Sequence, residues 1–185
     1  KGDFKRLSYA PSFGGYKLEN PFVRKKVSSW LKNFDLITVR ETEGIELCRK
    51  LGFEAKVVPD PTMLLNRDDY EKISGDLVDD HEFPYIFLYL LGSTITIEVS
   101  EIMAFAKQNN LSVVYVANQG REDVYEKIYP TVEEWLALVR DARYVITNSF
   151  HGTVFSLIFG KPFLTLPLSG SYSKMNGRIE DLLIK

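Results

Sequence analysis

Residues 85–91, YIFLYLL, form a near-continuous apolar run, and this run most constrains how the chain can fold. A strand with one face in water alternates apolar and polar side chains, whereas a strand that is buried on both faces does not. Apolar strands of this kind are typical of parallel sheets that are covered by helices on both sides. The run therefore predicts an α/β fold that is built on a parallel sheet.

Strand-like and helix-like patterns alternate along the rest of the chain. The predicted strands are short, apolar and rich in β-branched side chains, and they lie at residues 6–10, 36–40, 54–58, 85–91, 111–117, 143–147 and 162–166. The predicted helices have apolar side chains at helical spacing, and they lie at residues 22–34, 42–52, 66–74, 96–110, 131–142, 152–160 and 176–185. This alternation predicts two Rossmann-like α/β units with parallel sheets.

The acidic stretch SGDLVDDHEFP, residues 74–84, separates the two sets of patterns and has the composition of a linker. We therefore predict one unit at residues 1–80 and a second at residues 81–185. The chain begins without methionine, in the lead-in to a strand. We expect it to be a piece of a longer protein, with residues 1–80 forming the C-terminal part of an incomplete first Rossmann-like half.

The composition argues against several classes of protein. A formal net charge of -2 does not favour a nucleic-acid-binding surface. No apolar run approaches the ~18 residues that a membrane-spanning helix needs. The single cysteine, Cys48, cannot form an internal disulfide, which fits a reducing compartment such as the cytoplasm. We expect Cys48 to be a small buried apolar side chain and not a nucleophile.

Polar side chains follow four of the predicted strands, and open parallel sheets bind ligands beyond the carboxyl ends of their strands. These are Arg40 and Glu41, Asp60 and Thr62, the stretch TNSFHGT, and the stretch PLSGSYSKMNGR. Each has a structural alternative. Arg40 and Glu41 could be a solvated pair at a helix start, and Asp60 could bind backbone in a turn before a proline.

The stretch TNSFHGTVF combines groups that suit an anion. Asn148, Ser149 and Thr153 carry hydrogen-bonding side chains, and Gly152 lets backbone or ligand come close. Free N–H groups at a helix start attract negative charge. His151 could bind an anion as imidazolium or donate a proton to it, although a lone histidine at a helix start is more often satisfied by local hydrogen bonds.

The signatures of the common nucleotide, metal and hydrolase sites do not occur in the sequence. There is no G-x-G-x-x-G, no Walker A motif, no cluster with zinc-ligand spacing and no G-x-S-x-G elbow. We therefore expect no metal in the site.

Four stretches together resemble the polysaccharide pyruvyl transferase family. They follow the order and approximate spacing of that family over most of the chain, and they are SYAPSFG, ITVRETEGIELCRKLGFEAKVVPDPTMLL, YVITNSFHGTVFSLIFGKPFLTLP and GRIEDLL. The resemblance implies a fold similar to that of GT-B glycosyltransferases, with two Rossmann-like halves around a cleft. It also implies transfer of the enolpyruvyl group of phosphoenolpyruvate onto a sugar of a bacterial surface or extracellular polysaccharide, giving a pyruvate ketal and phosphate.

The resemblance also assigns roles to individual residues. The donor-site arginine of the family falls on Arg40, and the histidine of its S-F-H-G form falls on His151, the expected general acid. Many relatives carry an arginine where this chain has Ser149. Either another cation completes the donor site, with Arg178 and Lys174 as the candidates, or donor binding is weaker or altered.

The general base for the sugar hydroxyl is not evident from the sequence, and Glu41 and Asp60 are the candidates. The resemblance implies phosphoenolpyruvate as donor with no further cofactor. It implies a sugar or lipid-linked oligosaccharide as acceptor, in an enzyme of exopolysaccharide biosynthesis that is cytoplasmic or peripherally associated with a membrane. Two alternatives stay open, a sugar-nucleotide-dependent GT-B glycosyltransferase and a non-catalytic family member that binds sugars or anions.

Overall fold

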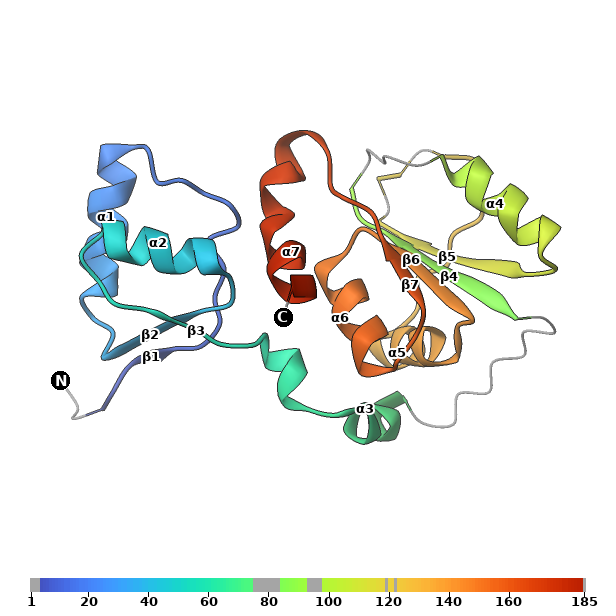
Figure 1. The fold of residues 1–185 in the computed structure, drawn as a ribbon, viewed down its shortest axis with the longest axis horizontal. Coiled ribbons are helices and arrows are strands. Elements are labelled where there is room, and N and C mark those ends of the chain that lie inside the picture. The colour runs from blue at the N-terminus through green and yellow to red at the C-terminus, as the bar shows by residue number, and fades with distance from the viewer. Residues whose placement is uncertain (1–3, 75–83, 93–97, 119, 122, 185) are drawn as a thin grey trace. The chain divides into compact units, whose positions relative to one another are not determined.

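A computed structural model describes residues 4–74, 84–92, 98–118, 120–121 and 123–184 (Figure 1). Parallel strands alternate with helices in these ranges, so the predicted α/β class with two Rossmann-like units is confirmed. Nearly all of the predicted linker, residues 74–84, lies outside the described residues. No helix in the described ranges combines the length and the apolar character that crossing a membrane requires.

The strands form two parallel sheets, one in the order β1-β2-β3 and one in the order β5-β4-β6-β7. The strands are β1 Leu7–Ser8, β2 Leu36–Val39, β3 Lys56–Val57, β4 Tyr85–Leu90, β5 Ser112–Ala117, β6 Tyr144–Thr147 and β7 Phe163–Thr165. The α-helices are α1 Pro21–Leu31, α2 Thr42–Lys50, α3 Arg67–Ser74, α4 Val99–Gln108, α5 Val132–Asp141, α6 Phe150–Ile158 and α7 Gly177–Ile184. Two 3-10 helices are η1 Pro61–Leu64 and η2 Gly170–Met175. Every predicted element is present, with bounds that differ by a few residues.

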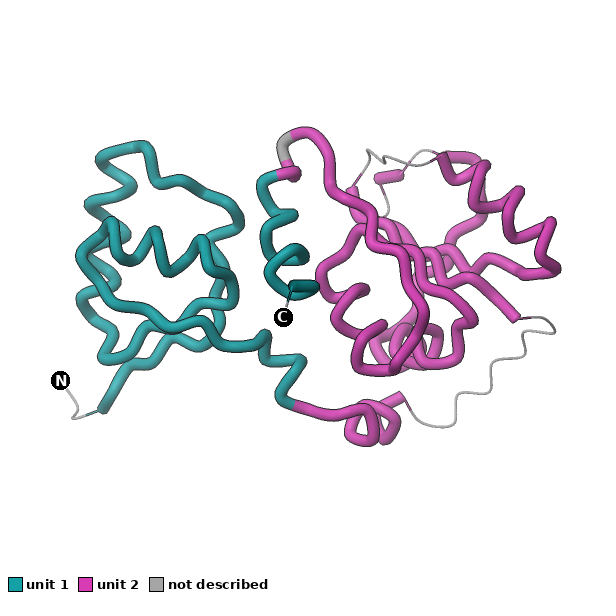
Figure 2. The backbone as a smooth tube through the Cα atoms, viewed as in Figure 1, with its two compact units in different colours: residues 1–64, 174–185 teal, residues 65–173 magenta. Residues whose placement is uncertain are grey.

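The chain divides into two compact units (Figure 2). Unit 1 contains Lys1–Leu64 together with Lys174–Lys185, and unit 2 contains Leu65–Ser173. Unit 1 is therefore discontinuous in sequence, because the whole of unit 2 lies between its two segments. The division into a first half at residues 1–80 and a second at 81–185 concerns the family architecture and stays a prediction.

The core of unit 2 lies on both faces of its sheet. Strand β4 is central, and the side chains of Ile86, Phe87 and Leu88 are fully buried. Because successive side chains of a strand point to opposite faces, Phe87 packs with residues of α5 and α6, whereas Ile86 and Leu88 pack with residues of α4. The prediction that residues 85–91 are covered on both faces is confirmed for β4, in which Tyr89 is partly buried and the other side chains are buried.

Unit 1 has a much smaller core. Its buried cluster consists of Ile37 and Val39 from β2 and Cys48 from α2. Cys48 is fully buried, as predicted, and burial raises the pKa of its thiol. Helix α7 belongs to this unit, and the Asp181 carboxylate accepts a hydrogen bond of 2.6 Å from the backbone N–H of Thr42 at the start of α2.

Candidate functional site

The predicted site residues form one group in each unit. Four of them come together in unit 1, from the ends of β2 and β3 and from α7, and they are Arg40, Glu41, Asp60 and Arg178. The others lie in unit 2, where β6 ends and α6 begins, and they are Asn148, Ser149, His151, Gly152 and Thr153.

Arg40 lies directly after β2 and is held between two carboxylates. Its Nη1 donates to Asp60 Oδ2 over 2.6 Å, and its Nε lies 3.8 Å from Glu41 Oε2. The Arg40 side chain is 18% exposed, so the pair with Asp60 is largely shielded from water. Charge-assisted hydrogen bonds of this kind are among the stronger polar interactions in proteins. The Arg40 guanidinium is thus fixed in position before any ligand arrives.

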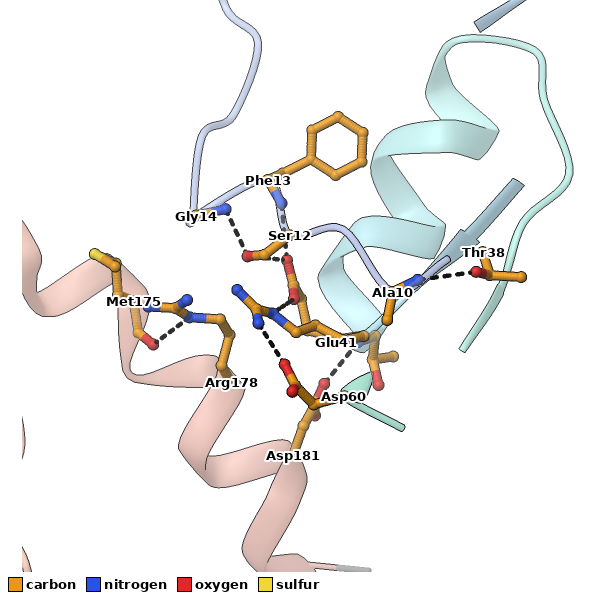
Figure 3. Close-up of polar contacts among 12 residues, drawn as sticks. Ala10, Ser12, Phe13, Gly14, Thr38, Glu41, Asp60, Met175, Arg178 and Asp181 are labelled. Atoms are coloured by element: carbon orange, nitrogen blue, oxygen red, sulfur yellow. Dashed lines mark hydrogen bonds and ion pairs between the residues drawn. The ribbon is translucent and has the colours of Figure 1, made fainter. Parts of the chain in front are cut away.

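The two carboxylates beside Arg40 also hold nearby backbone, and Figure 3 shows this for Glu41. Glu41 Oε1 accepts hydrogen bonds from Ser12 Oγ at 2.7 Å and from the Phe13 N–H at 3.0 Å. Asp60 Oδ1 accepts from the Thr62 hydroxyl at 2.8 Å and from its N–H at 3.1 Å. Each carboxylate therefore has one oxygen near the guanidinium and one in a loop. Their candidacy as the general base stays a prediction.

Arg178 brings a second guanidinium to the same cluster from α7 (Figure 3). Burial lowers the pKa of Arg178, and the positive charge of Arg40 lowers it further, while Glu41 and Asp60 act in the opposite direction. The group remains charged, because arginine does not lose its proton under ordinary conditions. Two guanidiniums and two carboxylates thus balance each other in charge.

In unit 2, the end of β6 is fastened to the end of β4. Thr147 Oγ1 donates to the Tyr89 carbonyl over 2.7 Å and accepts from the Ser149 N–H at 3.0 Å. The Asn148 amide accepts from the Leu91 N–H at 2.7 Å and donates to the Leu91 carbonyl over 2.8 Å. The side chains of Thr147 and Asn148 thus continue the hydrogen bonding between β6 and β4 beyond the last backbone pair. Asn148 therefore has a structural task, and its predicted role in donor binding stays a prediction.

Helix α6 begins at Phe150, two residues earlier than predicted, and Ser149 is its N-cap. The Ser149 hydroxyl accepts from the Gly152 N–H at 3.3 Å, a contact that serine makes readily at this position. The Thr153 hydroxyl donates to the Ser149 carbonyl over 3.0 Å and lies 2.8 Å from Thr165 Oγ1. Both hydroxyls are buried and serve the fold. Their predicted contact with the donor stays a prediction.

Gly152 is required for packing. A Cβ at this position would lie 2.4 Å from Thr147 Oγ1, so α6 can rest on β6 only if residue 152 has no side chain. The interpretation that Gly152 makes room for a ligand stays a prediction. His151 differs from its neighbours, because it is exposed in the first turn of α6 while Asn148, Ser149, Gly152 and Thr153 are buried.

Sequence reasoning missed Tyr89, which lies under this junction. Burial raises the pKa of Tyr89, and a hydrogen bond with Ser149 offsets part of that rise. The phenol is therefore neutral at ordinary pH. The only signal in the sequence was the position of Tyr89 near the end of an apolar strand, where a polar tip is unusual.

Two further observations bear on the chemistry of the site. In the ranges that the structure describes, no three His, Cys, Asp or Glu side chains come together as metal ligands. The cation predicted to compensate for Ser149 was Arg178 or Lys174, and the structure assigns both residues to unit 1.

Comparison with known families gives a match that covers most of the chain. The family model described as polysaccharide pyruvyl transferase matches residues 2–170, a range that includes Arg40 and His151 and ends before Arg178. A search of curated proteins found no match. The matched range contains the described strands of both sheets, so it is not a likeness in one motif alone. The chain belongs to the polysaccharide pyruvyl transferase family.

Proposed function

We propose that this chain transfers the enolpyruvyl group of phosphoenolpyruvate to a sugar, with His151 as the general acid. The family indicates pyruvyl transfer in general. The observation that supports this particular mechanism is the exposure of His151 at the start of α6, at the carboxyl edge of the four-stranded sheet. The surrounding polar side chains are buried, so His151 is the titratable group that this junction offers to a ligand.

The chemistry requires a proton at the methylene carbon of the donor. Protonation of this carbon by the imidazolium of His151 turns the methylene into a methyl group and leaves an oxocarbenium-like centre at the next carbon. A sugar hydroxyl attacks this centre and transfers its proton to a general base. A second hydroxyl of the sugar then displaces phosphate, which leaves with the second hydroxyl proton. The product is a cyclic ketal, and a bound anion keeps the imidazole protonated before the first step.

His151→Gln tests the assignment. The variant is expected to release phosphate from phosphoenolpyruvate about a hundredfold to ten-thousandfold more slowly than the native chain, with lipid-linked or nucleotide-linked sugars as acceptors. Its melting temperature is expected to stay the same, because the side chain is exposed. His81→Gln is the matched control, since His81 is the other histidine of the sequence and belongs to the predicted linker.

Full turnover by His151→Gln would contradict the assignment. The donor itself is tested by thermal shift, because a ligand that binds the native state raises the melting temperature. Phosphoenolpyruvate is expected to raise it, whereas UDP- and GDP-sugars are not. The reverse result would favour a sugar-nucleotide-dependent glycosyltransferase.

A further inference from the structure

A second charged network lies in unit 2, in the loop that follows β5, and none of the predicted site residues belongs to it. Arg121 Nε donates to Asp123 Oδ2 over 2.7 Å, and Tyr115 Oη donates to the same oxygen over 2.8 Å. Lys127 Nζ lies 2.8 Å from Asp123 Oδ1. Strands β4, β5 and β6 are parallel neighbours, so this loop and the start of α6 lie at the same edge of the sheet.

The Arg121 guanidinium is buried but not saturated. Its side chain is 3% exposed. Its Nε and Nη1 make hydrogen bonds, whereas its Nη2 has no hydrogen-bond partner within the described ranges. Nη2 is not fully enclosed by protein atoms, so water or a ligand can reach it. A guanidinium that is held through Nε and Nη1 and keeps an accessible Nη2 at the ligand-binding edge of a sheet therefore points to an anionic ligand.

The charges of the network do not cancel. Burial raises the pKa of Asp123, but hydrogen bonds from Lys127, Tyr115 and Arg121 together bring the pKa below its ordinary value, so the carboxylate is ionised. Burial and the hydrogen bond to Asp123 raise the pKa of Tyr115, so the phenol is neutral. Among the described residues of the network, two cations thus face one carboxylate, which leaves a surplus of one positive charge.

Of the two cations, only Arg121 has an N–H group that the network does not already use. The ammonium of Lys127 donates to the carbonyl oxygens of Asp123 and Tyr125 over 2.9 and 2.8 Å, and it also contacts the Asp123 carboxylate. An ammonium has only three protons, so these contacts use them all. The capacity to bind a further anion therefore belongs to Arg121.

Arg121 is also connected to the His151 junction through one short segment. Its Nη1 donates to the Gly92 carbonyl over 2.9 Å, and the adjacent residue, Leu91, is bound through both backbone groups by the Asn148 amide. Leu91 and Gly92 directly follow β4, and they are thus held by Asn148 and by Arg121 respectively. The stretch TNSFHGT contains no arginine or lysine, so this edge has no permanent positive charge from α6 or from the end of β6.

We propose that Arg121 supplies the permanent cation of the His151 site and binds an anionic oxygen of the donor, a phosphate monoester or a carboxylate. The identity of the donor as phosphoenolpyruvate rests on the function proposed above, whereas the binding of a phosphate-type anion by Arg121 does not. A charge-assisted hydrogen bond from a buried guanidinium strengthens binding more than an exposed lysine would, because water competes less for the anion.

The test measures binding of phosphoenolpyruvate and of inorganic phosphate by isothermal titration calorimetry. Arg121→Gln is expected to raise both dissociation constants about tenfold to a hundredfold, which corresponds to the loss of one hydrogen bond to a charged group. Arg121→Lys is expected to recover part of this loss, because it restores the charge without the planar fork. Arg143→Gln is the matched control, since Arg143 is exposed at the amino end of β6 in the same sheet.

Asp123→Asn separates anion binding from a purely structural role. It leaves Arg121 in place and raises the surplus positive charge, so phosphate is expected to bind more tightly. If the network serves only the fold, Asp123→Asn binds phosphate no better than the native chain, and the proposal is wrong. This variant also decides the question if Arg121→Gln does not fold.

The remaining outcomes are equally distinct. Arg121→Gln that folds and keeps the native phosphate affinity would overturn the proposal, as would a native chain that binds neither anion. A native chain that binds phosphate through Arg121 but releases none from phosphoenolpyruvate would support the anion site and contradict the proposed reaction.

Discussion

At the start of α6, the fold uses the polar side chains of Asn148, Ser149 and Thr153, which are buried, whereas His151 is exposed. Ser149 caps the helix, Asn148 pairs with backbone after β4, and Thr153 bonds back to the preceding turn. A helix cap stabilises a protein by about 1 kcal/mol, so each contact has a sufficient structural reason. The sequence located this junction correctly. The sequence could not show whether these side chains cap the helix or bind a ligand, because small hydroxyl and amide side chains are suited to both roles.

Gly152 gives a test of this packing at the scale of one residue. Gly152→Ala is expected to lower the free energy of unfolding by about 1–3 kcal/mol, because the new Cβ would overlap Thr147. Gly177→Ala is the control, since a Cβ there meets open space. Urea denaturation of both variants checks the difference. Equal stability of Gly152→Ala and the native chain would show that α6 can move away from β6 without cost.

Among the elements, α2 has an unusual start. Its N-cap residue, Glu41, makes no capping hydrogen bond, because its carboxylate is occupied by the loop at Ser12 and Phe13. The carboxylate that meets the start of α2 is that of Asp181 in α7. Periodicity predicted both helices, and the capping box at Thr131 was predicted and is present. The contact between α2 and α7 could not be predicted, since the two residues are 139 positions apart.

Asp181→Asn is therefore expected to destabilise unit 1 by about 0.5–1 kcal/mol, because the negative charge at the start of α2 is lost along with the strength of the hydrogen bond. Glu180→Gln removes the same charge from an exposed neighbour in the first turn of α7 and is expected to have a smaller effect, limited to its own helix. The melting temperatures of the two variants give the comparison. A larger drop in melting temperature for Glu180→Gln than for Asp181→Asn would contradict the prediction, because it would mean that the position of the charge in α7 does not matter.

The whole molecule combines two units with very different cores. Among the described residues, unit 2 has buried clusters of eleven and nine residues on the two faces of its sheet, whereas the cluster of unit 1 has three. Hydrophobic burial is the main stabilising term, so unit 1 is expected to open more easily. The alternation of strands and helices predicted both sheets. The contribution of residues 174–185 to unit 1 depends on contacts that local patterns do not contain.

The lone cysteine reports on unit 1, and a partly buried tryptophan reports on unit 2. Cys48 is fully buried and burial raises the pKa of its thiol, so it is expected to resist alkylation until unit 1 opens. Iodoacetamide is expected to label Cys48 at a lower urea concentration than the one that changes the fluorescence of Trp135, which packs against the core of unit 2. The measurement uses Trp30→Phe, because Trp30 is exposed in unit 1. Coincident transitions would instead show that the units unfold together.

The discontinuity of unit 1 also has a consequence for the order of events during synthesis. A ribosome makes the strands and first helices of this unit early, but α7 emerges only after the whole of unit 2 has been translated. Until then, the start of α2 lacks Asp181, and Arg40 lacks its companion Arg178. The nascent chain therefore passes through a stage in which unit 2 can already be folded while unit 1 still lacks its last helix.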